Sequence, residues 1–154
     1  MIPSPSPGEL VLTRLLAAPR TQVFQAWTDP ERLARWWGPA GFTNPVCELE
    51  PKPGGAIRIL MRAPDGTEYP MGGAVRDVDA PRRLVFTATA HEEADGIPGL
   101  ENLNTITFEE QDGGTALTVI VQVLRHTPTA APALAGMAQG WGQSLDRLEA
   151  LVRP

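Results

Sequence analysis

The sequence contains one cysteine and two histidines in 154 residues, and this scarcity excludes several kinds of site. A single thiol, Cys47, cannot form an internal disulfide bond or a thiol-rich metal site. With only His91 and His126, no spacing resembles a zinc site, so we expect no metal and no cofactor. The Gly-x-Ser-x-Gly, phosphate-loop and dinucleotide-binding signatures are also missing. No catalytic residue is therefore assigned from the sequence.

Long apolar runs and clusters of basic residues are scarce as well. No run approaches the roughly 20 apolar residues of a membrane-spanning helix. The first ten residues, MIPSPSPGEL, have neither the basic flank nor the apolar stretch of a signal peptide. The formal net charge is −5, and Arg82-Arg83 is the one adjacent basic pair, which argues against binding to nucleic acid. We therefore expect a cytoplasmic protein with no membrane span and no nucleic acid partner.

The length and composition are those of one globular domain. At 154 residues the chain is long enough to bury a core, and its 15 glycines and 16 prolines promise many turns. We expect residues 1–8, with their Pro-Ser repeat, to form a disordered lead-in. Residues 9–153 are predicted to form a single domain.

Hydrophobic spacing predicts two short helices between a first strand, 9–16, and a series of later strands. The first helix begins at Pro19, and the second lies within residues 28–39. Thr28 or Asp29 caps the second helix, while Gly38 and Pro39 end it. After Pro45 the period changes to two, with turn residues at hairpin spacing. The later strands are predicted at 46–50, 56–62, 69–79, 83–91, 104–110 and 115–124, with a long, less regular connection over 92–101.

The C-terminal segment, about 129–152, has apolar residues every three or four positions and is predicted as one long helix. Its apolar stripe must pack against another apolar surface, and one face of the sheet is the candidate. The polar residues Gln143 and Arg147 fall mostly on the other side of the helix. The predicted fold class is therefore α+β, with a curved antiparallel sheet wrapped on a long C-terminal helix and two short helices between strands one and two.

Several segments, from about residue 10 to residue 152, carry a family resemblance. They are APRTQVFQAWTDPERLARWWGPAGFTNPVCELEPKPGG, MRAPDGTEYPMGG, RRLVFT, TITFEEQDGGTALTV and GWGQSLDRLEALV. Together these segments resemble the activator-of-Hsp90-ATPase-homologue-like family of the START-like (SRPBCC) superfamily. The resemblance implies the helix-grip fold, also called START-like or Bet v 1-like. It further implies a cavity between sheet and helix for lipid-like, steroid-like or aromatic molecules, and several members of the superfamily are cyclases, hydratases or aromatases.

The adjacent tryptophans Trp36 and Trp37 raise the question of whether they form core or the wall of a ligand site. Leu33, Trp36 and Trp37 follow at helical spacing, so one apolar face carries all three. Trp141 lies between Gly140 and Gly142 in the long helix, where glycine is unfavourable. Methionine and small residues on the predicted inner faces suggest an adaptable lining, although such residues taken singly are more often part of the core. The candidate ligand-binding residues are Trp36, Trp37, Phe42, Met61, Tyr69, Met71, Phe86, Ala88, Met137 and Trp141.

Three functions remain open at this point. The leading prediction is binding of a hydrophobic or aromatic small molecule in a cavity of roughly 300–1,000 Å³, without an assigned reaction. The second is a cyclase or hydratase-type enzyme that uses the same cavity with Tyr69, His91 or a carboxylate. The third is a chaperone-associated interaction module. A stress-linked role is compatible with all three, and we expect a monomer or homodimer.

Overall fold

The computed structural model describes residues 9–92, 98–126 and 136–153. The expected disordered lead-in, 1–8, and the first part of the predicted C-terminal helix, 129–135, lie outside the described residues. The helices are α1 (Arg20–Thr28), α2 (Pro30–Leu33) and α4 (Met137–Val152). The strands are β1 (Glu9–Leu16), β2 (Thr43–Leu49), β3 (Ala56–Arg62), β4 (Glu68–Asp79), β5 (Arg83–Glu92), β6 (Pro98–Gln111) and β7 (Gly114–His126).

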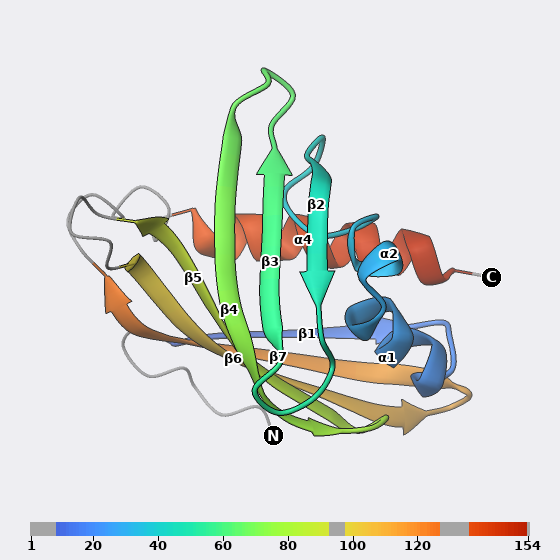
Figure 1. Ribbon diagram of the computed structural model, residues 1–154. Helices are drawn as coiled ribbons and strands as arrows, with labels where there is room; N and C mark the ends of the chain where they lie inside the picture. Colours follow the sequence, from blue (N-terminus) through green and yellow to red (C-terminus); the bar gives the residue numbers. More distant parts are fainter. Residues whose placement is uncertain (1–8, 93–97, 127–135, 154) are drawn as a thin grey trace.

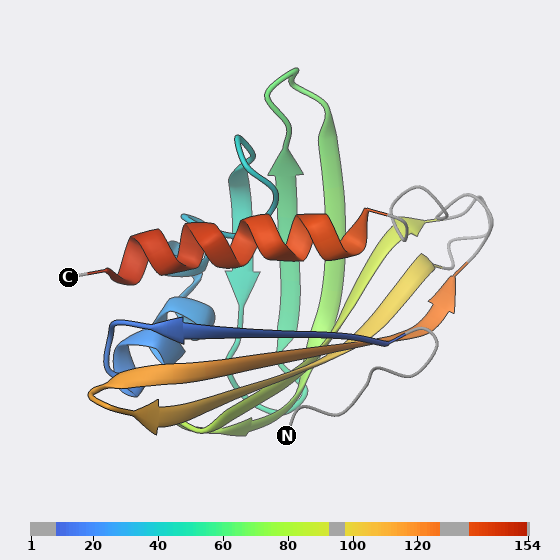
Figure 2. The ribbon, with the colours of Figure 1, turned by 180° about the vertical axis from the view of Figure 1, so that it is seen from behind.

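The strands form one antiparallel sheet in the order β1-β7-β6-β5-β4-β3-β2. The sheet curves around α4, which crosses its concave side, while α1 and α2 lie together beside the C-terminal half of α4 (Figures 1 and 2). This arrangement is the predicted helix-grip fold, and the prediction is confirmed. Burial follows from it, because the concave face and the apolar stripe of α4 cover each other. The inner faces bury Ile57 and Ile59, Leu84 and Phe86, Ile106 and Phe108, and Val119 and Val121 against Leu145 and Leu148 of α4.

Two strands begin earlier than the sequence predicts. Strand β2 starts at Thr43 and includes Pro45, which an edge strand tolerates because one side makes no ladder bonds. Strand β6 starts at Pro98, within the stretch predicted as an irregular connection. There the backbone of Leu100 pairs with Ala90 on one side and His126 on the other. Pairing on both sides outweighs the local turn signals, so the connection shortens to residues 93–97.

The second short helix is shorter than predicted and places the tryptophans after its end. Asp29 caps α2 by accepting a 3.0 Å hydrogen bond from the Glu31 backbone N–H. Thr28 instead donates its hydroxyl to a carbonyl of α1, so the predicted Thr28–Glu31 capping box does not form. The Trp36 and Trp37 N–H groups both donate to the Leu33 carbonyl. Gly38, with φ of +96°, then turns the chain away as predicted.

Strand β4 passes close to β5 at Gly73. A Cβ atom at this position would lie 1.9 Å from the Thr87 carbonyl oxygen, which leaves no room for any side chain. The Thr87 hydroxyl accepts from the Ala74 N–H at 3.0 Å and donates to the Ala74 carbonyl at 3.4 Å. Thr87 therefore replaces part of the backbone ladder where β4 turns upward to form the hairpin with β3 (Figure 1).

Cys47 on β2 packs against the core as a half-buried thiol. Burial, and secondarily the neighbouring Glu48 carboxylate, raise the pKa of this thiol from its ordinary value of 9.0 to about 11. The thiolate is the reactive form, so the shift lowers its fraction at pH 8 by about 100-fold. We expect iodoacetamide to alkylate the folded protein at pH 8 about 100-fold more slowly than the urea-unfolded chain, measured by mass spectrometry. Equal rates in the two states would contradict this placement of Cys47.

Candidate functional site

All four tryptophans of the chain contact one another between the sheet and α4. Trp27 comes from α1, Trp36 and Trp37 follow α2, and Trp141 comes from α4. The ring centroids of Trp27 and Trp36 are 4.7 Å apart, those of Trp36 and Trp37 5.8 Å, those of Trp37 and Trp141 5.4 Å, and those of Trp141 and Trp27 6.2 Å. Each indole therefore contacts two others, so the four side chains form a closed circle of contacts, which we call the tryptophan ring. Three of its pairs are edge-to-face, whereas Trp27 and Trp141 are stacked, and both geometries are favourable for aromatic pairs.

The tryptophan ring has a buried half and a half that approaches the surface. Trp27 and Trp36 are 1% and 0% exposed. The Trp36 indole N–H donates to the Ala26 carbonyl at 2.9 Å, so Trp36 is a core residue that ties α1 to the turn after α2. Trp37 is also buried, with its indole N–H 3.2 Å from the Met71 sulfur, whereas Trp141 is only partly buried. The paired tryptophans therefore differ in their surroundings. Trp36 lies in the core, whereas Trp37 contacts the partly buried Trp141.

The void enclosed beside the tryptophan ring is small. It measures about 10 Å³, close to the least that holds one water molecule. Its lining is apolar and consists of Trp27, Leu33, Trp37, Leu49, Ile57, Ile59, Met71, Leu84 and Phe86. The expected cavity of 300–1,000 Å³ is therefore not found here, because indole rings occupy the space between these strands and helices. A ligand at this place would have to take volume from a side chain that moves.

The other candidate residues form two groups. Met71, Phe86, Ala88 and Met137 pack on or beside the buried core that includes the tryptophan ring. Phe42, Met61 and Tyr69 lie toward the β3–β4 hairpin. There Tyr69 pairs with Met61 across the strands, and its ring centroid is 6.0 Å from that of Phe42. Tyr69 is 41% exposed, whereas Phe42 and Met61 are half-buried and Met61 packs against the core.

Arg147 of α4 holds the segment between α2 and β2 through the carbonyl groups of residues 35–42. Its two terminal nitrogens donate to five backbone oxygens. Nη1 reaches Trp37 O at 3.0 Å, Gly38 O at 2.9 Å and Pro39 O at 3.1 Å, and Nη2 reaches Arg35 O at 3.2 Å and Phe42 O at 3.1 Å. Burial lowers the pKa of the guanidinium from its ordinary value, yet arginine stays protonated in proteins. The guanidinium therefore fixes the backbone on either side of Trp37.

Two further side chains of α4 hold the same segment. The Ser144 hydroxyl accepts from the Gly38 N–H at 3.1 Å, and the Gln143 side-chain oxygen accepts from the Ala40 N–H at 3.1 Å. The sequence placed Gln143 and Arg147 mostly on the side of α4 away from the apolar stripe, and in the structure both side chains are half-buried because they bond to residues 35–42. The polar partners of these residues are backbone atoms about 100 positions earlier, which no periodicity reveals.

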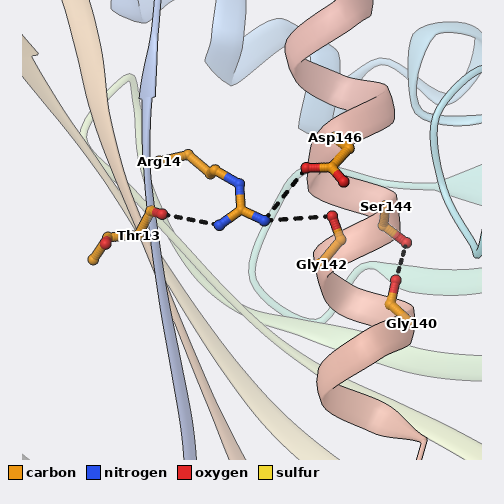
Figure 3. A network of polar contacts seen from close by, with 6 residues as sticks. All are labelled: Thr13, Arg14, Gly140, Gly142, Ser144 and Asp146. Carbon is orange, nitrogen blue, oxygen red and sulfur yellow. Dashed lines mark hydrogen bonds and ion pairs between the residues drawn. The ribbon is translucent and has the colours of Figure 1, made fainter.

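On its other side α4 is tied to β1 through Arg14 (Figure 3). The Arg14 Nη2 atom lies 3.5 Å from both the Gly142 carbonyl oxygen and the Asp146 carboxylate. The Ser144 hydroxyl, on the same stretch of helix, donates back to the Gly140 carbonyl at 3.0 Å. The helix around Trp141 is thus held by β1 on one side and by the segment 35–42 on the other.

The two glycines beside Trp141 are not required by close packing. A Cβ atom at Gly140 would lie 3.9 Å from Pro39, and one at Gly142 would lie 3.8 Å from Arg14, both ordinary contacts. Alanine is favoured over glycine in a helix by about 1 kcal/mol. We expect Gly140→Ala and Gly142→Ala each to raise the free energy of unfolding by roughly 0.5–1 kcal/mol in urea titrations. Gly73→Ala is the matched contrast and should destabilise the protein, and destabilisation by the helical substitutions would contradict the free space seen here.

A separate groove lies outside the grip, where α1, the segment after α2 and the end of α4 meet. It has a volume of about 590 Å³ and is open to solvent. Its lining is about equally polar and apolar and comprises Pro19, Thr21, Gln22, Gln25, Ala26, Arg32, Arg35, Leu151 and Val152. The groove shares no lining residue with the predicted ligand site.

In the described part of the chain, no three His, Cys, Asp or Glu side chains lie close enough to hold a metal ion. None of the described helices is long and apolar enough to span a membrane. The His91 side chain, named above for an enzyme, lies outside the described residues.

Comparisons with known proteins agree with this architecture. The family model for "Activator of Hsp90 ATPase homolog 1-like protein" matches residues 17–153. A crystal structure of a Chromobacterium violaceum protein is 30% identical, with a TM-score of 0.79, over 97% of this chain and 99% of that one. The AHSA1 protein of Silicibacter pomeroyi is 26% identical, with a TM-score of 0.76, over 92% of this chain and 95% of that one. No curated protein matches the sequence.

Proposed function

Because the chain belongs to the activator of Hsp90 ATPase homolog 1-like family, we propose that it binds a hydrophobic aromatic small molecule between the sheet and α4. The observation that carries the proposal is the tryptophan ring, which gathers every tryptophan of the chain and leaves Trp141 partly exposed. A flat ligand stacked on an indole gains about 0.5–1.5 kcal/mol beyond its buried area.

Entry of the ligand requires Trp141 to move, since the enclosed void holds no more than about one water molecule. Two properties of α4 support such a movement. Trp141 lies in the second turn of the helix, and the glycines on either side weaken that turn. The neighbouring Met71 and Met137 are flexible, polarisable side chains that adapt to ligands of irregular shape. Displacement of Trp141 would open its stacking partner Trp27 to a ligand ring.

Tryptophan fluorescence tests this proposal. The purified protein is titrated with a library of hydrophobic and aromatic metabolites, and the same titrations are repeated with Trp37→Phe and Trp141→Phe. The expected result is saturable quenching with an affinity about two- to tenfold weaker in one of these variants, because the indole that contacts the ligand is replaced by a smaller ring. Arg58→Met, at an exposed position of β3, is the control and should leave the affinity unchanged. Absence of saturable quenching across the library would overturn the proposal.

The open groove where α1, the segment after α2 and the end of α4 meet favours a second candidate function, which is interaction with a protein partner of the kind that the family name describes. Its open shape and its two arginines, Arg32 and Arg35, suit a polar, acidic segment of a partner better than an apolar small molecule. Stimulation of the ATPase of purified Hsp90 by the wild-type protein, and its loss in Arg32→Glu/Arg35→Glu, would support this role. An unchanged ATPase rate at saturating protein would exclude it.

A further inference from the structure

We propose that Asn102 and Asn104 of β6 are hydrogen-bond acceptors for the ligand, which is a neutral aromatic molecule carrying a hydroxyl group. This inference rests on the proposed function and narrows its ligand class. Neither asparagine is among the residues predicted from the sequence to line the site.

Strand register places both asparagines on the face that looks toward α4. Asn104 pairs directly with Phe86 of β5, and Asn102 pairs with Ala88. Directly opposed residues of an antiparallel pair share one face of the sheet. The ring of Phe86 contacts Trp27 and Trp37, so this face is the one that lies under the tryptophan ring. Two amides thus stand in a surface that is otherwise almost entirely apolar.

Each amide leaves its oxygen without a donor. Asn104 is 0% exposed, and its Nδ2 atom donates to the Phe86 carbonyl at 3.3 Å. That bond fixes the orientation of the amide, because a carbonyl accepts only from the nitrogen side. Its Oδ1 atom has no partner among the described residues, and neither has the Oδ1 atom of Asn102, which is 8% exposed. Buried acceptors without donors are unfavourable, so a ligand that supplies a donor relieves a cost already present in the fold.

The remaining polar groups of the interior define what the ligand carries. Buried polar residues in the described part of the chain are uncharged, and Thr87, Thr115 and Ser144 already bond to backbone groups. An anionic ligand would therefore lose its hydration without gaining a cation. The Trp27 indole N–H is a buried donor with no acceptor in the described part of the chain. A hydroxyl group donates one hydrogen bond and accepts others, so it suits one of the two amide oxygens, with this N–H as a further donor, better than an ether or a ketone, which only accept.

Matched pairs of rigid probes test this inference. The pairs are phenol with anisole, 2-naphthol with 2-methoxynaphthalene, and 1-hydroxypyrene with 1-methoxypyrene, and their affinities are measured by equilibrium dialysis. Within each pair the aromatic ring is the same, and methylation of the hydroxyl group removes the hydrogen-bond donor. The proteins are the wild type, Asn102→Leu, Asn104→Leu and the control Thr105→Val, which removes a polar group from the opposite face of the same strand.

The expected result is a preference of about tenfold for the hydroxylated member in the wild type and in Thr105→Val. The preference should fall to near one in the leucine variant that loses the acceptor of the hydroxyl, with binding of the ether unchanged, and a hydroxyl shared between the two oxygens lowers the preference in both variants. If one leucine variant fails to fold, the alanine variant at the same position replaces it. An undiminished preference in the folded variants at both positions, or equal binding of both members by the wild type, would overturn the inference and leave the proposed function standing. Binding of no probe by the wild type would overturn both.

Discussion

Replacing Arg147 by methionine is expected to lower the free energy of unfolding by about 3 kcal/mol, measured by urea titration. The guanidinium donates to five carbonyls of residues 35–42, which come from a turn that no strand or helix ladder satisfies. Hydrogen bonds to a charged group contribute about 1.5–3 kcal/mol each, but five bonds to one group are far from additive. Methionine retains much of the apolar stem, so the loss reports mainly the bonds.

Two further variants make this prediction specific. Arg147→Lys keeps the charge but carries its donors on one nitrogen, so it cannot reach carbonyls spread from Arg35 to Phe42. We expect lysine to recover less than half of the lost stability. Arg58→Met removes an exposed arginine from β3 and should change the free energy of unfolding by less than about 0.5 kcal/mol. If Arg147→Met lowered the free energy of unfolding no more than Arg58→Met, the hydrogen bonds from Arg147 to residues 35–42 would not stabilise the fold.

The second large effect concerns the tryptophan ring, whose two halves should respond differently to truncation. Trp36→Leu is expected to cost about 3 kcal/mol, because it removes a fully buried ring and leaves the Ala26 carbonyl without its donor. Trp141→Leu should cost about 1 kcal/mol, because its ring is partly exposed and makes fewer buried contacts. Thermal and urea unfolding of the two variants provide the measurement.

The comparison between Trp36 and Trp141 also bears on function. A site that opens by displacing Trp141 requires that residue to be separable from the core at modest cost. If Trp141→Leu destabilised the protein as much as Trp36→Leu, Trp141 would be a core residue like the other, and ligand entry by this route would fail. If both losses were small, the packing described for the tryptophan ring would be wrong.

Much of the fold follows from local pattern. The alternation of apolar and polar residues predicted β3 with its observed bounds, and β4 and β5 to within one residue. Gly38 changes the chain direction after α2, as expected. The early start of β6 was missed because pairing on both sides, with β5 and β7, outweighs turn-forming residues. The start of α4 was predicted at about residue 129, and the described helix begins at Met137.

The candidate site was predictable only as a set of residue types. Tryptophans, methionines and small residues in alternating strands indicated an aromatic, adaptable lining, and the structure brings Trp37, Met71, Phe86 and Trp141 together. The sequence did not show that the rings themselves fill the enclosed volume. Nor did it show that Arg147, on the side of the helix away from the apolar stripe, bonds to residues 35–42.

The amino-acid order is enough to specify which segments are strands and helices and that they form a helix-grip domain, because those properties depend on spacing within a dozen residues. Other properties depend on atoms more than 100 positions apart, such as the Arg147 guanidinium and the Gly38 carbonyl. The different environments of Trp36 and Trp37 likewise depend on strand register and on the placement of α4. The same holds for the amide oxygens of Asn102 and Asn104 beneath the tryptophan ring. Burial and hydrogen bonding are properties of three-dimensional neighbours, and a linear pattern does not contain them.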